Sequence, residues 1–412
     1  MKRHLLKIIP LVIILIVQAQ AKAQTRDSIP LHKSPNQKLV DSLTYEMDVV
    51  DFINKSFHVH LTSKPDTLKL KPGKLFFAFV PAVGYTLEGS WLGNISLNTS
   101  FYLSNPDSTN LSTITYGALY TVRHQFVMPI ITEVWSKNNK LNWLGDWRFY
   151  KYPANTYGLG AKTNAANADL VDFLYVRFYQ ECLLHFHAFY YFGGGVNYDD
   201  HFNIKEGGTN ADYTLYNKGA THTVSSGPVL HFMYDSRTNT NNPRDASYIS
   251  LTYRNNNSIF GSSSNWQEIF AEYKTYICLS HHSSNTLCLW SWNVFTFGGN
   301  APYFDLPSNG WDIYSNSGRG YIQGRFRGQN MVYAEAEYRF KITRRGLLGG
   351  VIFTNAESLS EYPSNKFQAI DPGYGGGLRL KMNKYSDVNL GIDYAFGLNG
   401  SKGVFFNLGE VF

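Results

Sequence analysis

This chain is poor in cysteine and in charge, and it lacks long apolar runs beyond its first residues. Its only cysteines, Cys182, Cys278 and Cys288, cannot all pair with one another and lie in strand-like segments. We therefore expect the three cysteines to act as small apolar strand residues and not to form a disulfide framework. After residue 23 there is no apolar run of about 18 residues, which excludes helical membrane spans from that part of the chain.

Motifs that would indicate catalysis or a bound cofactor are also missing. There is no Gly-x-Ser-x-Gly elbow and no phosphate-binding loop. His185 and His187 share one strand face, but metal sites need three or four converging ligands. We expect no catalytic residues, no metal and no cofactor, although Ser, His and Asn from separate strands remain an alternative source of a hydrolase site.

The first residues have the features of a secretory signal. Lys2, Arg3 and Lys7 accompany the apolar run 5–17, and Ala21-Lys22-Ala23 offers a small-residue cleavage site. Cleavage after Ala21, at the alternative site Ala19-Gln20-Ala21, removes those three cations and lowers the formal charge from +6 to +3, and cleavage after Ala23 also removes Lys22. The basic balance therefore indicates no nucleic-acid partner. We assign residues 1–23 to a signal peptide and 24–72 to a short periplasmic segment, in which residues 36–57 have the apolar spacing of an amphipathic helix.

From about residue 73 the hydrophobic period changes to two. In the segment 388–398, Ile392 and Tyr394 alternate with Gly391 and Asp393. About sixteen such runs of roughly ten residues can be counted up to residue 412, and the chain contains 29 Tyr and 28 Phe. The fold class expected is all-β: a transmembrane antiparallel β-barrel of 16 strands over residues 73–412, preceded by one short helix. Fourteen strands is the alternative, because the turn within 111–136 is hard to place.

The lengths of the connections give this barrel an orientation. If the first strand rises from the periplasm, the four long connections all fall outside: 153–169, 200–221, 299–329 and 357–372. The turns near residues 137–139, 343–346 and 384–385 are then short and periplasmic, as in outer-membrane barrels.

Several motifs resemble the barrel domain of BamA/TamA-type outer-membrane proteins, the bacterial surface antigen family. The most informative is Gly318-Arg319-Gly320-Tyr321, which precedes the alternating strand Met331–Phe340. The other matching stretches, in the family's order, are Tyr157-Gly158-Leu159-Gly160, Tyr234-Asp235-Ser236-Arg237 with Pro243-Arg244-Asp245, Gly375–Arg379, Asn389–Gly397 and the C-terminal Phe412. The segment before the barrel is too short for even one of the family's POTRA domains.

The resemblance implies that loop 299–329 folds into the lumen and is held there by Arg319. The partners of Arg319 would be Glu335, Glu337, Asn355 and Asp393. Asn355 and Glu357 stand where the family pattern has Asp and Gly, which removes one charge-assisted contact. The alternative is that Arg319 is an exposed loop cation.

Closure of the barrel requires pairing of the first and last strands. We call the junction between these two strands the seam, and we expect its pairing to be weak. Pro81 lies inside the first strand and lacks a donor, while Gly409 and Phe412 lie in the last strand. A local bulge at Pro81 is the alternative interpretation.

The function implied by the resemblance is to assist insertion or translocation of other proteins through this seam, in the outer membrane of a Gram-negative-type bacterium. The partners would be outer-membrane lipid, unfolded barrel or secreted clients and a separate periplasmic protein. The alternatives are a passive channel or structural barrel and, third, an outer-membrane enzyme.

Overall fold

The computed structural model describes residues 46–61, 72–106, 108–208, 212–279 and 285–412. The expected signal peptide and the first part of the expected helix lie outside the described residues. Within the described part, the N-terminal segment contributes one helix, α3 (Val49–Phe57), and most of the remainder is one antiparallel sheet.

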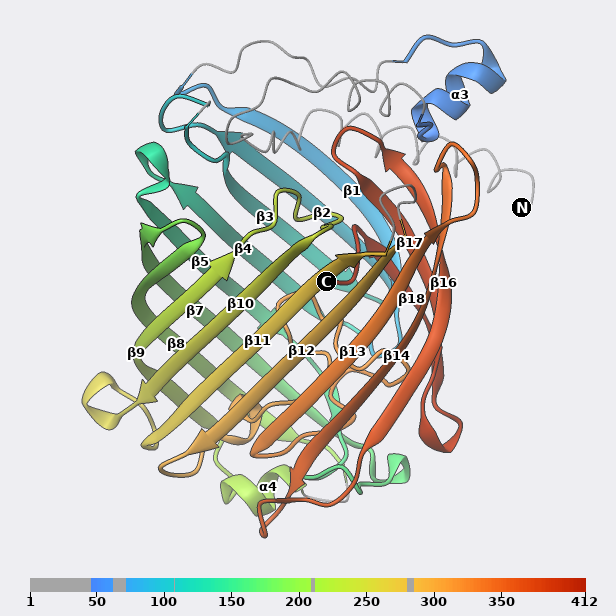
Figure 1. Cartoon of the computed structure of the whole chain (residues 1–412). Coiled ribbons are helices and arrows are strands. Elements are labelled where there is room, and N and C mark those ends of the chain that lie inside the picture. The colour runs from blue at the N-terminus through green and yellow to red at the C-terminus, as the bar shows by residue number, and fades with distance from the viewer. Residues whose placement is uncertain (1–45, 62–71, 107, 209–211, 280–284) are drawn as a thin grey trace.

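The sheet has 18 strands, of which β6 and β15 contain only three and two residues. The other 16 form the barrel wall, so the sixteen-strand prediction is confirmed (Figure 1). Each wall strand from β1 to β17 pairs antiparallel with the next wall strand along the chain. The strands are β1 Phe76–Thr86, β2 Ser90–Phe101, β3 Ser112–Thr121, β4 Phe126–Trp135, β5 Leu141–Lys151, β6 Ala154–Thr156, β7 Asp169–His187, β8 Tyr190–Glu206, β9 His222–Asp235, β10 Ala246–Asn256, β11 Trp266–Cys278, β12 Thr286–Phe297, β13 Asn330–Lys341, β14 Leu348–Glu361, β15 Lys366–Phe367, β16 Asp371–Asn383, β17 Val388–Phe396 and β18 Lys402–Leu408.

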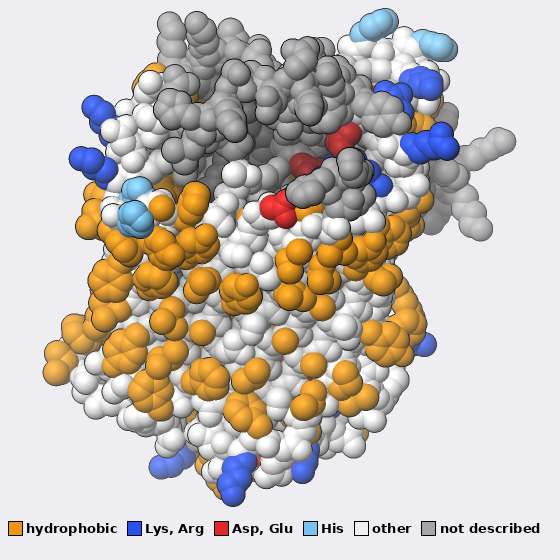
Figure 2. Space-filling view, viewed as in Figure 1, with side chains coloured by type: hydrophobic (Ala, Val, Ile, Leu, Met, Phe, Trp, Pro, Cys, Tyr) orange, Lys and Arg blue, Asp and Glu red, His pale blue; other side chains and the backbone are white. Residues whose placement is uncertain are grey.

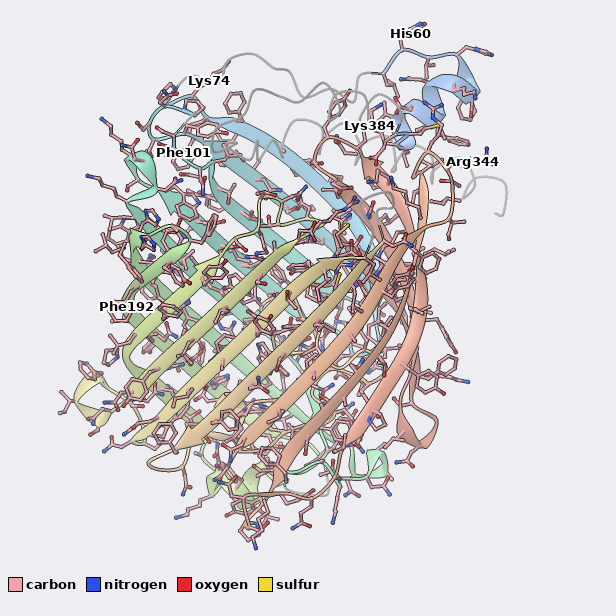
Figure 3. All side chains as sticks on the ribbon, viewed as in Figure 1. His60, Lys74, Phe101, Phe192, Arg344 and Lys384 are labelled. Atoms are coloured by element: carbon pink, nitrogen blue, oxygen red, sulfur yellow. The ribbon has the colours of Figure 1, made fainter. Side chains whose placement is uncertain are left out.

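Alternation along the strands sends apolar side chains outward and polar ones into the lumen. On β17, Ile392 and Tyr394 are exposed, whereas Asp393 between them is fully buried. Figure 2 shows hydrophobic side chains spread over the side of the barrel, with Lys and Arg gathered at its two ends. Phe192 on β8 points away from the wall in Figure 3. This distribution suits a lipid-facing exterior. None of the described helices is both long enough and apolar enough to span a bilayer.

The two ends of the barrel differ in the length of their connections. The β13–β14 turn and the β16–β17 turn lie at one end, beside α3 (Figure 1). The helix α4 (Asp212–Asn217), in the long β8–β9 connection, lies at the opposite end. Between β12 and β13 the chain turns back into the barrel, so the residues after Phe297 lie in the lumen.

The helix α3 packs on the rim of the barrel, over two short turns. Val49 and Val50 are buried against Leu347, Met382 and Val388. Asp48, the N-cap residue of α3, forms a capping box with Asp51 and accepts a hydrogen bond from the backbone N–H of Lys384. Lys384 Nζ donates to Asp51 over 2.7 Å. Lys384 and Arg344 lie at this end of the barrel in Figure 3. The helix therefore covers the rim above β16 and does not enter the lumen.

Candidate functional site: the lumen loop and the seam

The lumen loop, residues 298–329, is held on one side by an aromatic cluster. Phe304 stacks on Phe173 of β7 with ring centroids 4.2 Å apart, and Trp311 packs edge-on against Tyr152 at 5.6 Å. Within the loop, Arg327 Nη1 donates to the carbonyl oxygens of Tyr303 and Leu306. The two ring contacts join the loop to β7 and to the residue that follows β5, and the Arg327 bonds hold the loop together internally.

Asp305 lies next to this cluster, at the end of a 3₁₀ turn that begins at Tyr303. Its Oδ2 accepts a hydrogen bond from Ser225 Oγ over 2.6 Å, and its Oδ1 lies 3.6 Å from His201 Nδ1. Burial raises the pKa of Asp305 to about 8. The charge on this carboxyl group therefore changes within the physiological pH range.

On the opposite side of the loop, Arg319 lies among acidic side chains of β13 and β17. Its exposed fraction is 1%, and its guanidinium donates to Asp393 over 2.6 Å, to Glu337 over 2.6 Å and to Glu335. Phe353 of β14 lies below the guanidinium, 3.5 Å from ring centroid to Cζ. Burial alone would lower the pKa of Arg319, but the facing carboxylates raise it well above its ordinary value. The alternative of an exposed loop cation does not fit this geometry.

The backbone around Arg319 is also fixed. Asn355 meets Arg319 differently from the other expected partners, because its Nδ2 donates to the carbonyl oxygen of Arg319 over 2.9 Å and does not face the guanidinium. Gly320 has φ +112°, and a Cβ there would lie 2.7 Å from the carbonyl oxygen of Phe396. The Tyr321 hydroxyl donates to Pro372 O and accepts from the N–H of Leu398.

Three side chains that the sequence analysis did not select extend this ionic network. Arg379 of β16 donates to Asp393 and, over 2.8 Å, to Glu410. Arg339 of β13 donates to Glu337 over 2.7 Å. A signal was available in the sequence, because Arg339 follows Glu337 by two residues and so shares its inward face. Nothing comparable indicated Glu410, which lies beyond the last strand.

The seam between β1 and β18 differs from the other junctions of the wall. The two strands lie side by side (Figure 1), but among their described residues no antiparallel register joins them. A Cβ on Gly403 would lie 2.5 Å from the Leu87 side chain, so this side chain covers the start of β18. Pro81 pairs with Ile95 in an unbroken β1–β2 register, which argues against the bulge alternative.

The C-terminus departs from the last strand that the sequence predicts through residue 412. β18 ends at Leu408, and Gly409 has φ +93° with open space around it. Val411 and Phe412 are then buried within the cluster that includes Trp290 and Tyr276 (in Figure 1 the C-terminus lies within the outline of the barrel). Phe412 is therefore not a residue of the seam. Alternation predicts a strand but does not predict where the chain leaves the wall.

A serine, a histidine and a glutamate also lie together on the lumen wall. Ser250 Oγ lies 2.9 Å from His231 Nε2, and His231 Nδ1 lies 2.6 Å from Glu181 Oε2. This is the order of a serine, a base and an acid in hydrolases. Ser250 is only 3% exposed, however, and the neighbouring backbone belongs to paired strands, where its N–H groups are not free to form an oxyanion hole. Among the described residues, no group of three or more His, Cys, Asp or Glu side chains is arranged to hold a metal ion.

Comparison with known proteins gives matches in structure but not in sequence. No family model matches the chain, and no curated protein matches it. A crystal structure of BamA from Haemophilus ducreyi lacking POTRA domains 1–3 superposes with a TM-score of 0.52. The two sequences are 14% identical over 81% of this chain and 68% of the BamA chain.

CdiB from Acinetobacter baumannii superposes with a TM-score of 0.54, at 14% identity, over 95% of this chain and 71% of the CdiB chain. This chain has the barrel fold of BamA and CdiB. The structural likeness agrees with the resemblance found through the Arg-Gly-aromatic motif, and at this level of identity it establishes the architecture.

Proposed function

We propose that this chain is an outer-membrane barrel that assists insertion or translocation of other proteins through its β1–β18 seam. The observation that supports this is the contrast between the seam and the rest of the wall: every other pair of adjacent wall strands has an antiparallel register. Clients would be unfolded barrel or secreted proteins, and a separate periplasmic protein would deliver them. In this proposal the chain consists of a signal peptide at 1–23, a periplasmic segment at 24–72 and the barrel at 73–412.

The physical reason for this role is the cost of an unpaired strand edge. Backbone N–H and C=O groups facing lipid without partners cost several kcal/mol each. An incoming strand that pairs with the free edge of β1 or β18 removes this cost by β-augmentation. Pro81 and Gly409 favour a weak seam, because the first lacks a donor and the second marks the point where β18 ends.

The test is insertion of an unfolded barrel into proteoliposomes that contain this protein. A disulfide between Leu87→Cys and Gly403→Cys would lock the seam, since these two positions are in contact. Cys182, Cys278 and Cys288 are replaced in all variants. The proposal predicts that the protein accelerates insertion, that oxidation abolishes the acceleration, and that a reductant restores it.

A disulfide elsewhere in the wall provides the matched control. Tyr394 and Val404 are direct partners in the β17–β18 register. The Tyr394→Cys/Val404→Cys variant should therefore remain active when oxidised. Acceleration that survives the seam lock would refute the seam mechanism, and no acceleration by the unlocked protein, with periplasmic extract added, would refute the function.

A passive channel or structural barrel is the second candidate. Asn355 supports it, because its amide replaces the acid of the family pattern and does not face the Arg319 guanidinium. Removing residues 302–326 would then raise single-channel conductance, while insertion of the test barrel would be no faster than in empty liposomes.

An outer-membrane enzyme is the third candidate, favoured by the Ser250–His231–Glu181 arrangement. It predicts hydrolysis of ester or lipid substrates that is lost in Ser250→Ala. Lack of activity on both substrate types would leave the three side chains as a polar network of the lumen wall.

A further inference from the structure

A cavity beside the β13–β14 turn is lined mainly by cations. Its volume is about 40 Å³, which gives room for roughly three water molecules at about 10–15 Å³ each. Among the described residues that line it, one is acidic, Glu410, and five are cationic: Arg244, Arg339, Lys341, Arg379 and Lys381. A lining of this charge concentrates small anions.

The register of three wall strands explains how two of these cations face one space. Lys341 of β13 lies opposite Gly349 of β14, and Gly349 lies opposite Arg379 of β16. Direct partners in adjacent strands point to the same side of the sheet. A Cβ on Gly349 would lie 3.5 Å from Arg379 Cβ and 3.1 Å from Phe340 O. The glycine therefore keeps the space between the two cations clear of a side chain.

Two guanidinium groups of the lining retain N–H donors for an anion. Arg339 is only 6% exposed, and its Nη1 has no hydrogen-bond partner among the described atoms. Arg244 lies 3.6 Å from Asp387, which is beyond the range of a hydrogen bond. Donors of this kind bind oxyanions through charge-assisted hydrogen bonds.

One acid at this site comes from outside the barrel. Glu46, three residues before α3, accepts a hydrogen bond from Lys341 Nζ over 2.8 Å and lies 3.6 Å from Lys381 Nζ. The backbone N–H of Met47 donates to Arg345 O over 2.8 Å, which holds this segment at the β13–β14 turn. Because Glu46 belongs to no strand, its carboxylate can leave the two lysines without breaking the sheet.

The count of charges shows what Glu46 does there. With Arg319, the five lining cations make six, and among the described residues their ion-pair partners in the barrel are the five acids Glu335, Glu337, Asp387, Asp393 and Glu410. Glu46 is the sixth acid. It therefore balances a positive charge that the barrel by itself leaves uncompensated.

We propose that this cavity binds a phosphate-type oxyanion and that Glu46 is the built-in competitor of this ligand. A phosphate group offers acceptor oxygens in several directions, which suits donors that come from Arg244, from β13 and from β16. A bound oxyanion takes the place of the Glu46 carboxylate on Lys341 and Lys381. The phosphate is either a free ion or part of a phospholipid headgroup. This binding does not rest on the proposed function.

The test measures the thermal midpoint of the barrel by heat-modifiable gel migration, in a sugar-based detergent, with sodium phosphate or with sodium chloride of equal ionic strength. Phosphate also stabilises folded proteins by exclusion from their surface, so the result is the difference between variants. The dependence of the midpoint on phosphate concentration gives an apparent Kd.

Three variants separate the proposal from a general salt effect. Glu46→Gln should bind phosphate about five- to tenfold more tightly, because the competing carboxylate is gone. Arg244→Gln should bind it at least about fivefold more weakly. Lys140→Gln, at an exposed lysine of the β4–β5 turn, is the matched control and should bind as the unmodified protein does. If Arg244→Gln does not fold, Lys341→Gln replaces it, since that side chain is 34% exposed.

The source of the phosphate is resolved with a second probe, dihexanoyl phosphatidylglycerol. Stabilisation by this lipid that is lost in Arg244→Gln assigns the site to a headgroup, and stabilisation by inorganic phosphate alone assigns it to the free ion. Equal effects of phosphate on the unmodified protein, Glu46→Gln and Arg244→Gln would overturn the proposal. Insertion of a test barrel is not part of this measurement, so its outcome leaves the proposed function untouched.

Discussion

Arg319 on the lumen loop and Asp393 on β17 are 74 positions apart in the sequence, and their charged groups meet at 2.6 Å in a site where both side chains are buried. Glu335 and Glu337 complete the carboxylates around the same guanidinium. The contact with Asp393 fixes the loop against β17, the strand that pairs with the seam strand β18, so the position of the loop and the integrity of β17 depend on each other.

Replacing Arg319 should destabilise the barrel strongly. Arg319→Ala removes the shared guanidinium from three buried carboxylates; Glu337 and Asp393 keep Arg339 and Arg379, whereas Glu335 loses its ion pair. Removing one partner of such a buried group costs about 3–5 kcal/mol. The thermal midpoint of heat-modifiable gel migration measures the effect. Arg344→Ala, in the exposed β13–β14 turn, is the control and should change the midpoint little. A similar midpoint for both variants would contradict the anchoring role.

Two glycines of the lumen loop should respond differently to alanine. Gly320→Ala places a Cβ 2.7 Å from Phe396 O at φ +112°, whereas Gly324→Ala, at φ +76°, meets no atom closer than 3.7 Å. Both variants bear the cost of a left-handed backbone, about 1 kcal/mol, but only Gly320→Ala must also move the loop away from β17. We expect faster proteolysis of the loop in Gly320→Ala alone, and equal proteolysis of both variants would refute the close approach.

Docking of the lumen loop should weaken as the pH rises. Because the folded pKa of Asp305, about 8, lies above its ordinary value of 3.8, the folded state binds more protons than the unfolded state between these values. The contribution of the protonated Asp305 to the stability of the folded state is therefore present at low pH and is lost as the pH rises from about 4 to about 8.

The variant Asp305→Asn removes this titration while keeping an acceptor for Ser225. Its thermal midpoint should fall less than that of the unmodified protein between pH 6 and pH 9. Parallel midpoints for the two proteins would show that Asp305 does not titrate in this range. The comparison is needed because Asp199, His201, Arg254 and Glu268 also act on this carboxyl group.

The rim helix α3 should be released by changing one turn residue. Lys384→Ala removes the 2.7 Å ion pair with Asp51, at a cost of about 1 kcal/mol. A thiol introduced as Val50→Cys, at a position that is 2% exposed, should then react faster with a maleimide. Lys55→Ala, on the exposed side of the same helix, should leave the reaction rate unchanged. Equal rates in the two variants would mean that Lys384 does not hold the helix.

The sequence by itself determined the wall of this protein. A period of two sends Ile392 and Tyr394 outward and Asp393 inward wherever one face meets an apolar medium and the other meets water, so strand number and facing could be predicted locally. The inward positions of Glu335 and Glu337 follow from the same rule. Arg319 could be predicted as the partner of these two glutamates only from the family resemblance of the Arg-Gly-aromatic turn. The alternation along the strand does not indicate which cation they bind.

The tertiary structure alone decided what fills the lumen. The Asn355 amide binds the backbone of Arg319 and leaves the guanidinium to others, a choice set by where the loop lies. Gly409 ends the last strand, and Phe412 turns inward because Trp290 and Arg339 offer a ring to stack on and a donor for its carbonyl oxygen. These contacts join residues far apart in the chain, and no local pattern encodes them. They depend on the inner faces of distant strands lying opposite one another across the lumen.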